Sequence, residues 1–148
     1  QTELKFMPAI YAEDEDLEMR FIKEKNKTTD DFVITENLFY ELGESAITPS
    51  SKALLNKMEQ VLEMHKEFKL LVISHTDSQG DEASNLKLSL KRSESVVNYL
   101  ISKGIDASRL KAEGKGETEI RNRCFNNVDC SDKEHEYNRR TEFKFTKK

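Results

Sequence analysis

The chain has 148 residues, of which 35% are charged and 36% hydrophobic, and its net charge is −4. This length predicts one domain with a single hydrophobic core. Without a clustered basic face, the acidic balance argues against binding to a nucleic-acid backbone. The sequence contains no run of about 18 to 20 apolar residues that could span a bilayer, and its first residues lack the apolar core of a signal peptide. We therefore expect a soluble segment, either mature or cut from a longer protein.

Within the first 30 or so residues, the stretch "YAEDEDLEMRFIKEKNKTTDD" (11–31) is mostly charged, with the isolated apolar residues Leu17, Met19, Phe21 and Ile22. Such a segment could form a short amphipathic helix. Its composition is more typical of a linker or of the tail of a preceding region. We therefore expect residues 1–30 to be a charged linker and residues 31–148 to be the folded domain.

Residues 31–74 have the pattern of a strand, a helix and a second strand. The β-branched and aromatic residues of "DFVITENLFYEL" (31–42) predict the first strand. Pro49 begins a helix whose buried stripe we expect to contain Leu54, Met58, Val61, Leu62 and His65. The aliphatic run in "FKLLVIS" (68–74) predicts the second strand.

The second half of the chain predicts one more long helix and two more strands. The helix stripe is expected to contain Leu86, Leu90, Ser93, Val97, Leu100 and Ile101, and Gly104 can end this helix. "SRLKAEG" (108–114) predicts a strand joined to the second strand by a right-handed parallel crossover. In "RRTEFKFT" (139–146), the alternation of Phe143 and Phe145 with charged residues predicts a half-buried strand. The order β-α-β-α-β-β predicts an α/β (α+β) two-layer sandwich with helices on one face of a mixed sheet.

Asp77 and Arg92 are the candidate binding residues. Asp77 follows the second strand, where α/β sheets commonly bind ligands, and Arg92 can point back from the next helix towards that helix's N-terminus. Together they could hold a zwitterion, because a carboxylate binds an ammonium and a guanidinium binds a carboxylate through two hydrogen bonds. Asn85 and Thr76 could add neutral hydrogen bonds. In the alternative interpretation, Asp77 only braces its loop and Arg92 pairs with nearby acids.

A metal site and a catalytic site are the other possibilities. His75, Asp77, Cys124, Cys130 and His135 are potential metal ligands, but the cysteine and histidine spacings are not the close pairs typical of zinc. No nucleophile and base occur together in a recognisable catalytic motif. We therefore expect no metal, no cofactor and no enzymatic activity. The two cysteines can close a small loop in an oxidising compartment or remain thiols in a reducing one.

An ordered set of short motifs runs through residues 32–146. These motifs resemble the pattern of the OmpA-like peptidoglycan-binding domain, H-T-D-x-x-G, N-x-x-L-S-x-x-R, V-x-x-Y-L, G-I, R-[IL], G-x-G-E and N-R-R-V-E-F. The matching residues are His75, Thr76, Asp77, Gly80, Asn85, Leu88, Ser89, Arg92, Val96, Tyr99, Leu100, Gly104, Ile105, Arg109, Gly114, Gly116, Glu117, Asn138, Arg139, Arg140, Glu142 and Phe143. Any one motif is weak, but the whole set in this order is specific.

The resemblance implies a non-catalytic module that binds the diaminopimelate residue of the peptidoglycan stem peptide. It implies that Asp77 and Arg92 are the two charged anchors and that Asn85 and Leu86 line the pocket. Arg140, by the same resemblance, lies near the pocket rim. Leu42 and Gly43 depart from the family pattern, because they replace the Phe and Asp that usually follow the first strand.

The segment "NRCFNNVDCSDKEHEYNRRTEF" (122–143) resembles a two-cysteine variant of the family. The resemblance implies a disulfide between Cys124 and Cys130, worth about 2 kcal/mol at this loop length. It also suits the oxidising space outside the inner membrane.

The implied role is to anchor an outer-membrane protein or an envelope complex to the cell wall. The module would then be periplasmic and attached to the outer membrane through a region upstream of residue 1. The alternative is an OmpA-like scaffold whose main role is protein-protein interaction in an envelope complex. A wall-binding module needs both charges free to face solvent, whereas a scaffold could pair them with neighbouring groups.

Overall fold

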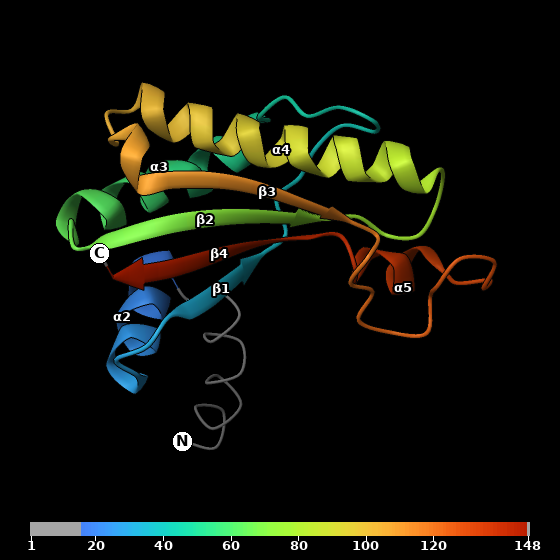
Figure 1. The fold of residues 1–148 in the computed structure, drawn as a ribbon, viewed down its shortest axis with the longest axis horizontal. Coiled ribbons are helices and arrows are strands. Elements are labelled where there is room, and N and C mark those ends of the chain that lie inside the picture. The colour runs from blue at the N-terminus through green and yellow to red at the C-terminus, as the bar shows by residue number, and fades with distance from the viewer. Residues whose placement is uncertain (1–15, 148) are drawn as a thin grey trace, which may run out of the picture.

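The protein folds as a four-stranded sheet with helices packed against it (Figure 1). The computed structural model describes residues 16–147. In chain order the elements are α2 (Leu17–Lys27), β1 (Phe32–Glu36), α3 (Pro49–Met64), β2 (Phe68–His75), α4 (Glu82–Ser102), the 3-10 turn η1 (Ala107–Arg109), β3 (Leu110–Gly116), α5 (Asp132–Glu136) and β4 (Arg140–Lys147). The predicted order of strands and long helices is confirmed, with α2, η1 and α5 as additions.

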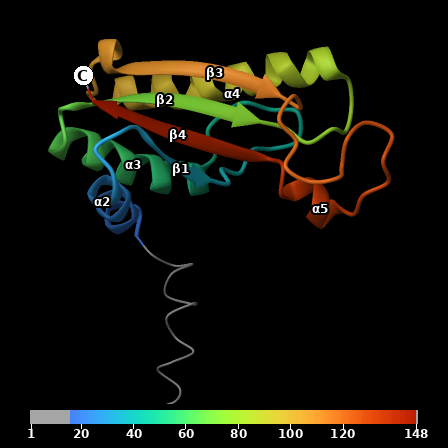
Figure 2. The ribbon, with the colours of Figure 1, turned by 60° about the horizontal axis from the view of Figure 1, so that its bottom comes forward.

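The sheet has the strand order β1-β4-β2-β3. β2 and β3 are parallel and joined by α4, as the predicted crossover requires, whereas β4 is antiparallel to both β1 and β2. The sheet is therefore mixed. Figures 1 and 2 show α3 and α4 on one side of it and the short α5 beyond the carboxyl ends of β2 and β3. The predicted α/β architecture is confirmed.

The hydrophobic core lies between the helices and one face of the sheet. Thr141, Phe143 and Phe145 alternate along β4 and are buried, as their period of two predicted. The ring of Phe145 stacks on Phe32 and meets Phe68 edge-on. Aromatic side chains from the central strands β4 and β2 and from the edge strand β1 therefore fill one continuous core.

Helix α3 has a phase close to the predicted one. Thr48 caps its N-terminus by accepting a hydrogen bond from the Ser51 backbone at 3.3 Å. The buried residues include Met58, Val61 and Leu62 from the predicted stripe, but Leu55 takes the fully buried position and Leu54 is only partly buried.

Strand β1 is shorter than the predicted strand, because the chain after Glu36 forms hydrogen bonds with the start of α3. The carbonyl of Phe39 accepts hydrogen bonds from the hydroxyls of Thr48 and Ser51 at 2.9 and 3.0 Å. The chain after Glu36 therefore leaves the sheet and packs against the start of α3.

Residues 17–27 form the helix α2, where we expected a linker. Leu17 and Phe21 are buried in the core, and Phe21 contacts the rings of Phe68 and Phe145. Two buried side chains on a charged helix leave its average composition close to that of a linker, so composition could not separate the two interpretations. Residues 1–15 of the expected linker lie outside the described residues.

Helix α4 buries a different face from the predicted one. Leu86 and Leu90 are 47% and 40% exposed, and Ile101 is also exposed. The buried residues are Ser89, Ser93, Val96 and Leu100, of which the prediction contained Ser93 and Leu100. Gly104, with φ +107°, ends the helix as predicted. Within residues 16–147, no helix combines the length and the apolar character needed to cross a bilayer.

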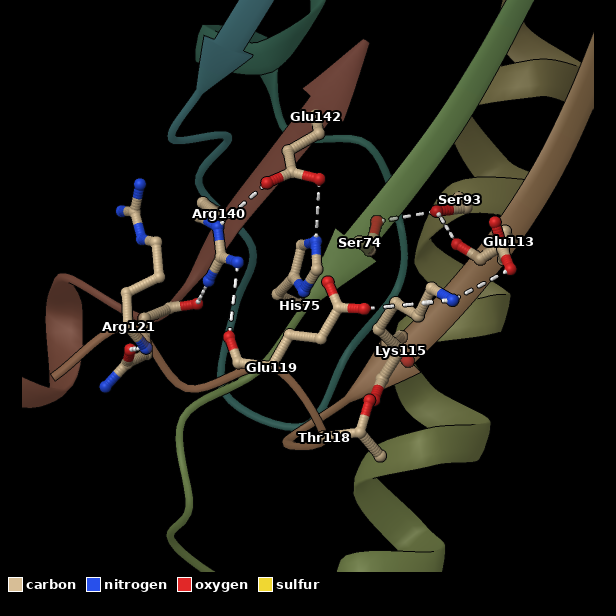
Figure 3. A network of polar contacts seen from close by, with 12 residues as sticks. Ser74, His75, Ser93, Glu113, Lys115, Thr118, Glu119, Arg121, Arg140 and Glu142 are labelled. Carbon is tan, nitrogen blue, oxygen red and sulfur yellow. Dashed lines mark hydrogen bonds and ion pairs between the residues drawn. The ribbon is translucent and has the colours of Figure 1, made fainter. Parts of the chain in front are cut away.

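Helix α4 buries its serines rather than its leucines because α4 and β3 approach each other closely. A Cβ placed on Gly114 would lie 2.3 Å from the backbone nitrogen of Leu90. The Ser89 hydroxyl accepts a hydrogen bond from Gly116 N at 2.9 Å, and the Ser93 hydroxyl is bonded to the Glu113 carbonyl at 2.8 Å (Figure 3). Only small residues fit at this distance, so the serines face the strand and the leucines face outwards.

Candidate ligand-binding site

Asp77 lies in the loop that follows β2. The loop starts at the sheet, because Thr76 N donates to the Gly116 carbonyl at 2.8 Å. The carboxylate of Asp77 accepts from the Gln79 backbone at 2.9 Å and from the Gln79 side-chain amide at 3.1 Å. Asp77 is only 6% exposed. The loop therefore folds around its acid and fixes the position of that acid.

Arg139 forms an ion pair with Asp77. Arg139 lies between the turn that follows α5 and the start of β4, and its Nη1 contacts Asp77 Oδ2. The resemblance to the family implied that the other arginine of the N-R-R motif, Arg140, lies at the pocket rim, and it did not single out Arg139. The useful signal was strand alternation, because adjacent residues at the start of a strand point in different directions.

Arg140 is buried in a polar network on the sheet, shown in Figure 3. Its guanidinium donates to Glu142 Oε2 at 3.2 Å, to the Asn138 carbonyl at 3.1 Å and to the Glu119 carbonyl at 3.2 Å. The other carboxylate oxygen of Glu142 lies 3.1 Å from Nε2 of His75. These three contacts of Arg140 thus join β4 to the preceding loops, and its place at the pocket rim stays a prediction.

His75 joins this network at the end of β2. Burial lowers the pKa of His75, and Arg140 lowers it further, while Glu142 acts in the opposite direction. The imidazole therefore favours its neutral form in the folded protein.

Arg92 points from α4 towards the turn after β1. Its Nε donates to the Glu44 carbonyl at 2.8 Å, and its guanidinium lies 4.4 Å from the centre of the Tyr40 ring. Burial lowers the pKa of Arg92. Tyr40 raises that pKa, Arg139 lowers it, and Asp77 raises it. Asp77 and Arg139 form an ion pair, and both act electrostatically on Arg92; these three residues are called the charged cluster below.

The turn that holds Arg92 contains the two residues that depart from the family pattern. Leu42 is fully exposed, and Gly43 has φ +72°. The turn closes with a 2.9 Å hydrogen bond from Glu44 N to the Glu41 carbonyl. Glycine suits this position, because a positive φ is unfavourable for residues with a Cβ. The turn thus offers backbone carbonyls to Arg92.

The other predicted residues lie around the Asp77 loop. The Asn85 amide donates to the Gln79 carbonyl at 2.9 Å and to Glu117 at 3.0 Å, so Asn85 braces the loop from α4. The Thr76 hydroxyl donates to the Asp77 carbonyl at 2.9 Å and is buried. Leu86 is exposed on α4 beside them.

A disulfide joins Cys124 and Cys130, as the resemblance implied. The Cys124 carbonyl accepts a 2.6 Å hydrogen bond from the Ser78 hydroxyl. The disulfide loop therefore also supports the loop that carries Asp77. Within residues 16–147, the one group of three potential metal ligands is Cys124, Cys130 and Glu134, and sulfurs in a disulfide are not available as thiolate ligands.

The fold and the charged cluster define a class of protein, the OmpA-like domain. A mixed sheet carries an acid after its second strand and an arginine on the following helix, at the positions of the H-T-D and L-S-x-x-R motifs. The OmpA family model matches residues 39–132, and the chain belongs to the OmpA family.

Curated relatives agree with this assignment. The chain is 38% identical over 84 residues to outer membrane protein A of Bordetella avium, covering 57% of this chain and 43% of that protein. It is 34% identical over 94 residues to outer membrane protein A of Klebsiella aerogenes, covering 62% of this chain and 27% of that protein. The chain thus spans less than half the length of these relatives.

Solved structures share the fold. The cell wall anchor of the T6SS from Pseudomonas aeruginosa superposes with a TM-score of 0.70 and 24% identity, covering 87% of this chain and 96% of that one. The peptidoglycan-associated lipoprotein from Burkholderia pseudomallei gives a TM-score of 0.64 and 20% identity, covering 79% and 90%. These similarities confirm the architecture.

Proposed function

We propose that this domain binds peptidoglycan without catalysis and anchors an envelope protein or complex to the cell wall. Membership of the OmpA family supports the proposal, as do the names of its structural neighbours, a cell wall anchor and a peptidoglycan-associated lipoprotein. The relatives named outer membrane protein A support a periplasmic location, with attachment to the outer membrane through a region upstream of residue 1.

The proposed ligand group is the diaminopimelate residue of the stem peptide. The observation that carries this proposal is that an acid after β2, Asp77, and an arginine on the following helix α4, Arg92, occupy the positions of the family's H-T-D and L-S-x-x-R motifs. The side chain of diaminopimelate ends in an ammonium and a carboxylate. Asp77 would take the ammonium, and Arg92 would take the carboxylate through two hydrogen bonds. The same proposed site includes Leu86, which is exposed on α4. It also includes Asn85 and Thr76, which support the Asp77 loop.

The expected affinity is modest. Two charge-assisted contacts of about 1.5 to 3 kcal/mol each give binding no tighter than about the micromolar range. The cell wall presents many identical stem peptides to an anchored domain, and a high local concentration of ligand compensates for weak single-site binding.

A calorimetric titration tests the proposal. The wild-type domain is titrated with a diaminopimelate-containing stem peptide and with the matched lysine-containing peptide, which lacks the side-chain carboxylate. We expect the first to bind at least tenfold more tightly, because only that peptide offers Arg92 a charged partner. Equal affinities, or failure to sediment with purified sacculi, would refute the assignment.

A protein-binding scaffold is the second candidate, and one observation favours it. Both charges have internal partners, since Asp77 pairs with Arg139 and Arg92 donates to the turn that follows β1. A scaffold requires nothing more of these residues than local support. It predicts unchanged sacculus binding when Asp77 is neutralised, whereas the wall-binding proposal predicts its loss.

A further inference from the structure

The ion pair between Asp77 and Arg139 lies at the position where the proposed ligand places its ammonium. We propose that Arg139 is a specificity-determining residue, the internal counterion of Asp77 that an external ammonium must displace. This inference rests on the proposed function, because it concerns how the same site chooses its ligand.

Arg139 is on the solvent side of the acid. Its side chain is 39% exposed, whereas the side chain of Asp77 is 9% exposed. Asp77 Oδ1 accepts from the Gln79 backbone, and Oδ2 both accepts from the Gln79 side-chain amide and pairs with Arg139. An ammonium that approaches Oδ2 from solvent therefore meets the Arg139 guanidinium at that oxygen.

The neighbouring surface has room for the displaced side chain. A groove of about 520 Å³ is lined by Arg139, by residues at the end of β1 and by both acidic and basic side chains, among them Glu36, Glu136, Lys133, Arg121 and Arg140. The backbone of Arg139 is held, because its N–H donates to the Glu136 carbonyl at 3.1 Å. Rotation of the side chain alone can bring the guanidinium into this groove, where the carboxylate of Glu136 offers a new partner. The loop does not need to unfold.

The exchange favours a zwitterion over a simple amine. In the free site, Asp77 pairs with Arg139, and both act electrostatically on Arg92. The three side chains together carry a formal charge of +1. If Arg139 stays in the adjacent groove, binding of a simple ammonium raises the formal charge of the site to +2. A ligand that also carries a carboxylate keeps this charge at +1 and gives Arg92 a charged partner. Arg139 therefore penalises amines that lack an adjacent carboxylate.

Chemical labelling tests the screening of Asp77 without any ligand. Wild type, Arg139→Gln and Arg139→Lys are treated with a carbodiimide and glycine ethyl ester, and amidation of Asp77 is followed by peptide mass spectrometry. We expect Asp77 to be modified several-fold faster in Arg139→Gln and at an intermediate rate in Arg139→Lys. Arg123→Gln is the matched control, because Arg123 pairs with Glu134 of α5 and not with Asp77. Equal rates in wild type and Arg139→Gln would overturn the proposal.

Peptide titration tests the effect on specificity. In Arg139→Gln, we expect the ratio of lysine-peptide to diaminopimelate-peptide dissociation constants to narrow about fivefold, within the range measured for one partly exposed ion pair. If both affinities stay unchanged, the proposal is contradicted. If both affinities fall by the same factor, the proposal is also contradicted, and Arg139 is instead a direct ligand contact. If wild type binds neither peptide, the proposed function fails, and the labelling rates still decide whether Arg139 screens Asp77.

Discussion

The two charged anchors of the site are held in different ways. Asp77 is fixed by its own loop, by the segment before β4 and, through Ser78, by the disulfide loop. Arg92 instead donates to carbonyls of the turn 41–44, at whose tip Leu42 is fully exposed. The acid has a charged partner and support from three segments, whereas, within residues 16–147, the hydrogen bonds of the Arg92 guanidinium go to neutral carbonyls of one exposed turn.

The difference teaches which half of the site is preorganised. The carboxylate keeps its position when a ligand arrives, because the bonds from Gln79 need not change. Arg92 can exchange neutral carbonyls for a ligand carboxylate, which binds it more strongly. We infer that the acid fixes the position of the ligand and the arginine adapts to it. The predictions below test this contrast.

Neutralising the acid should have the largest effect. Asp77→Asn keeps the shape of the side chain and removes its charge, so the affinity for the diaminopimelate peptide should fall about 100-fold, near the upper end for a charge-assisted contact. Calorimetry measures the loss, and circular dichroism checks the fold. Asp129→Asn, at an exposed position of the disulfide loop, is the control and should bind normally. If Asp77→Asn binds the peptide normally, Asp77 is not a ligand contact.

Replacing the arginine should have a smaller effect. Arg92→Met retains the apolar stem and loses the charge, and we expect about a tenfold loss of affinity, the lower end for such a contact. The affinity of Arg92→Lys should lie between those of Arg92→Met and wild type, because lysine keeps the charge but cannot form the bidentate hydrogen bonds of a guanidinium. Titration of all three proteins with the same peptide checks the order. A loss for Arg92→Met as large as that for Asp77→Asn would contradict the proposed contrast.

Opening the disulfide loop should loosen the acid side only. The double variant Cys124→Ser and Cys130→Ser should lower the free energy of unfolding by about 2 kcal/mol, because the unfolded chain regains the freedom of the loop. At this chain length, that corresponds to a melting temperature about 6 °C lower. Peptide affinity should fall less than in Arg92→Met. Ser78→Ala removes the 2.6 Å contact to Cys124 but keeps the disulfide, so it separates the two contributions.

Acid should weaken the folded state through His75, which precedes the Asp77 loop. Its pKa lies below the ordinary 6.5 in the folded protein. The contribution of His75 to stability is therefore complete above 6.5 and is lost as the pH falls towards the folded pKa, since the unfolded chain binds the proton more readily. Melting temperatures measured between pH 7.5 and 5 should decline, and His75→Gln should flatten the slope. An identical slope in both proteins would exclude His75 as the cause.

Sequence patterns worked where one strong periodicity controlled burial. The alternation around Phe143 and Phe145 placed β4 correctly, since a strand has only two faces. On α4 the same reasoning failed, because leucine is more hydrophobic than serine and yet too large for the gap opposite Gly114. In the first 30 residues, average charge hid the two apolar side chains with which α2 packs into the core.

The sequence by itself determined the fold class and the family, and it placed Asp77 after the second strand and Arg92 on the following helix, because turn glycines, apolar periods and ordered motifs are local signals. Only the tertiary structure decided that Arg139 rather than Arg140 meets the acid and that the disulfide loop supports Ser78. It also decided that small residues of α4 face β3. These contacts join segments far apart in the chain, and they depend on strand register and on the distance between layers, which residue types alone do not encode.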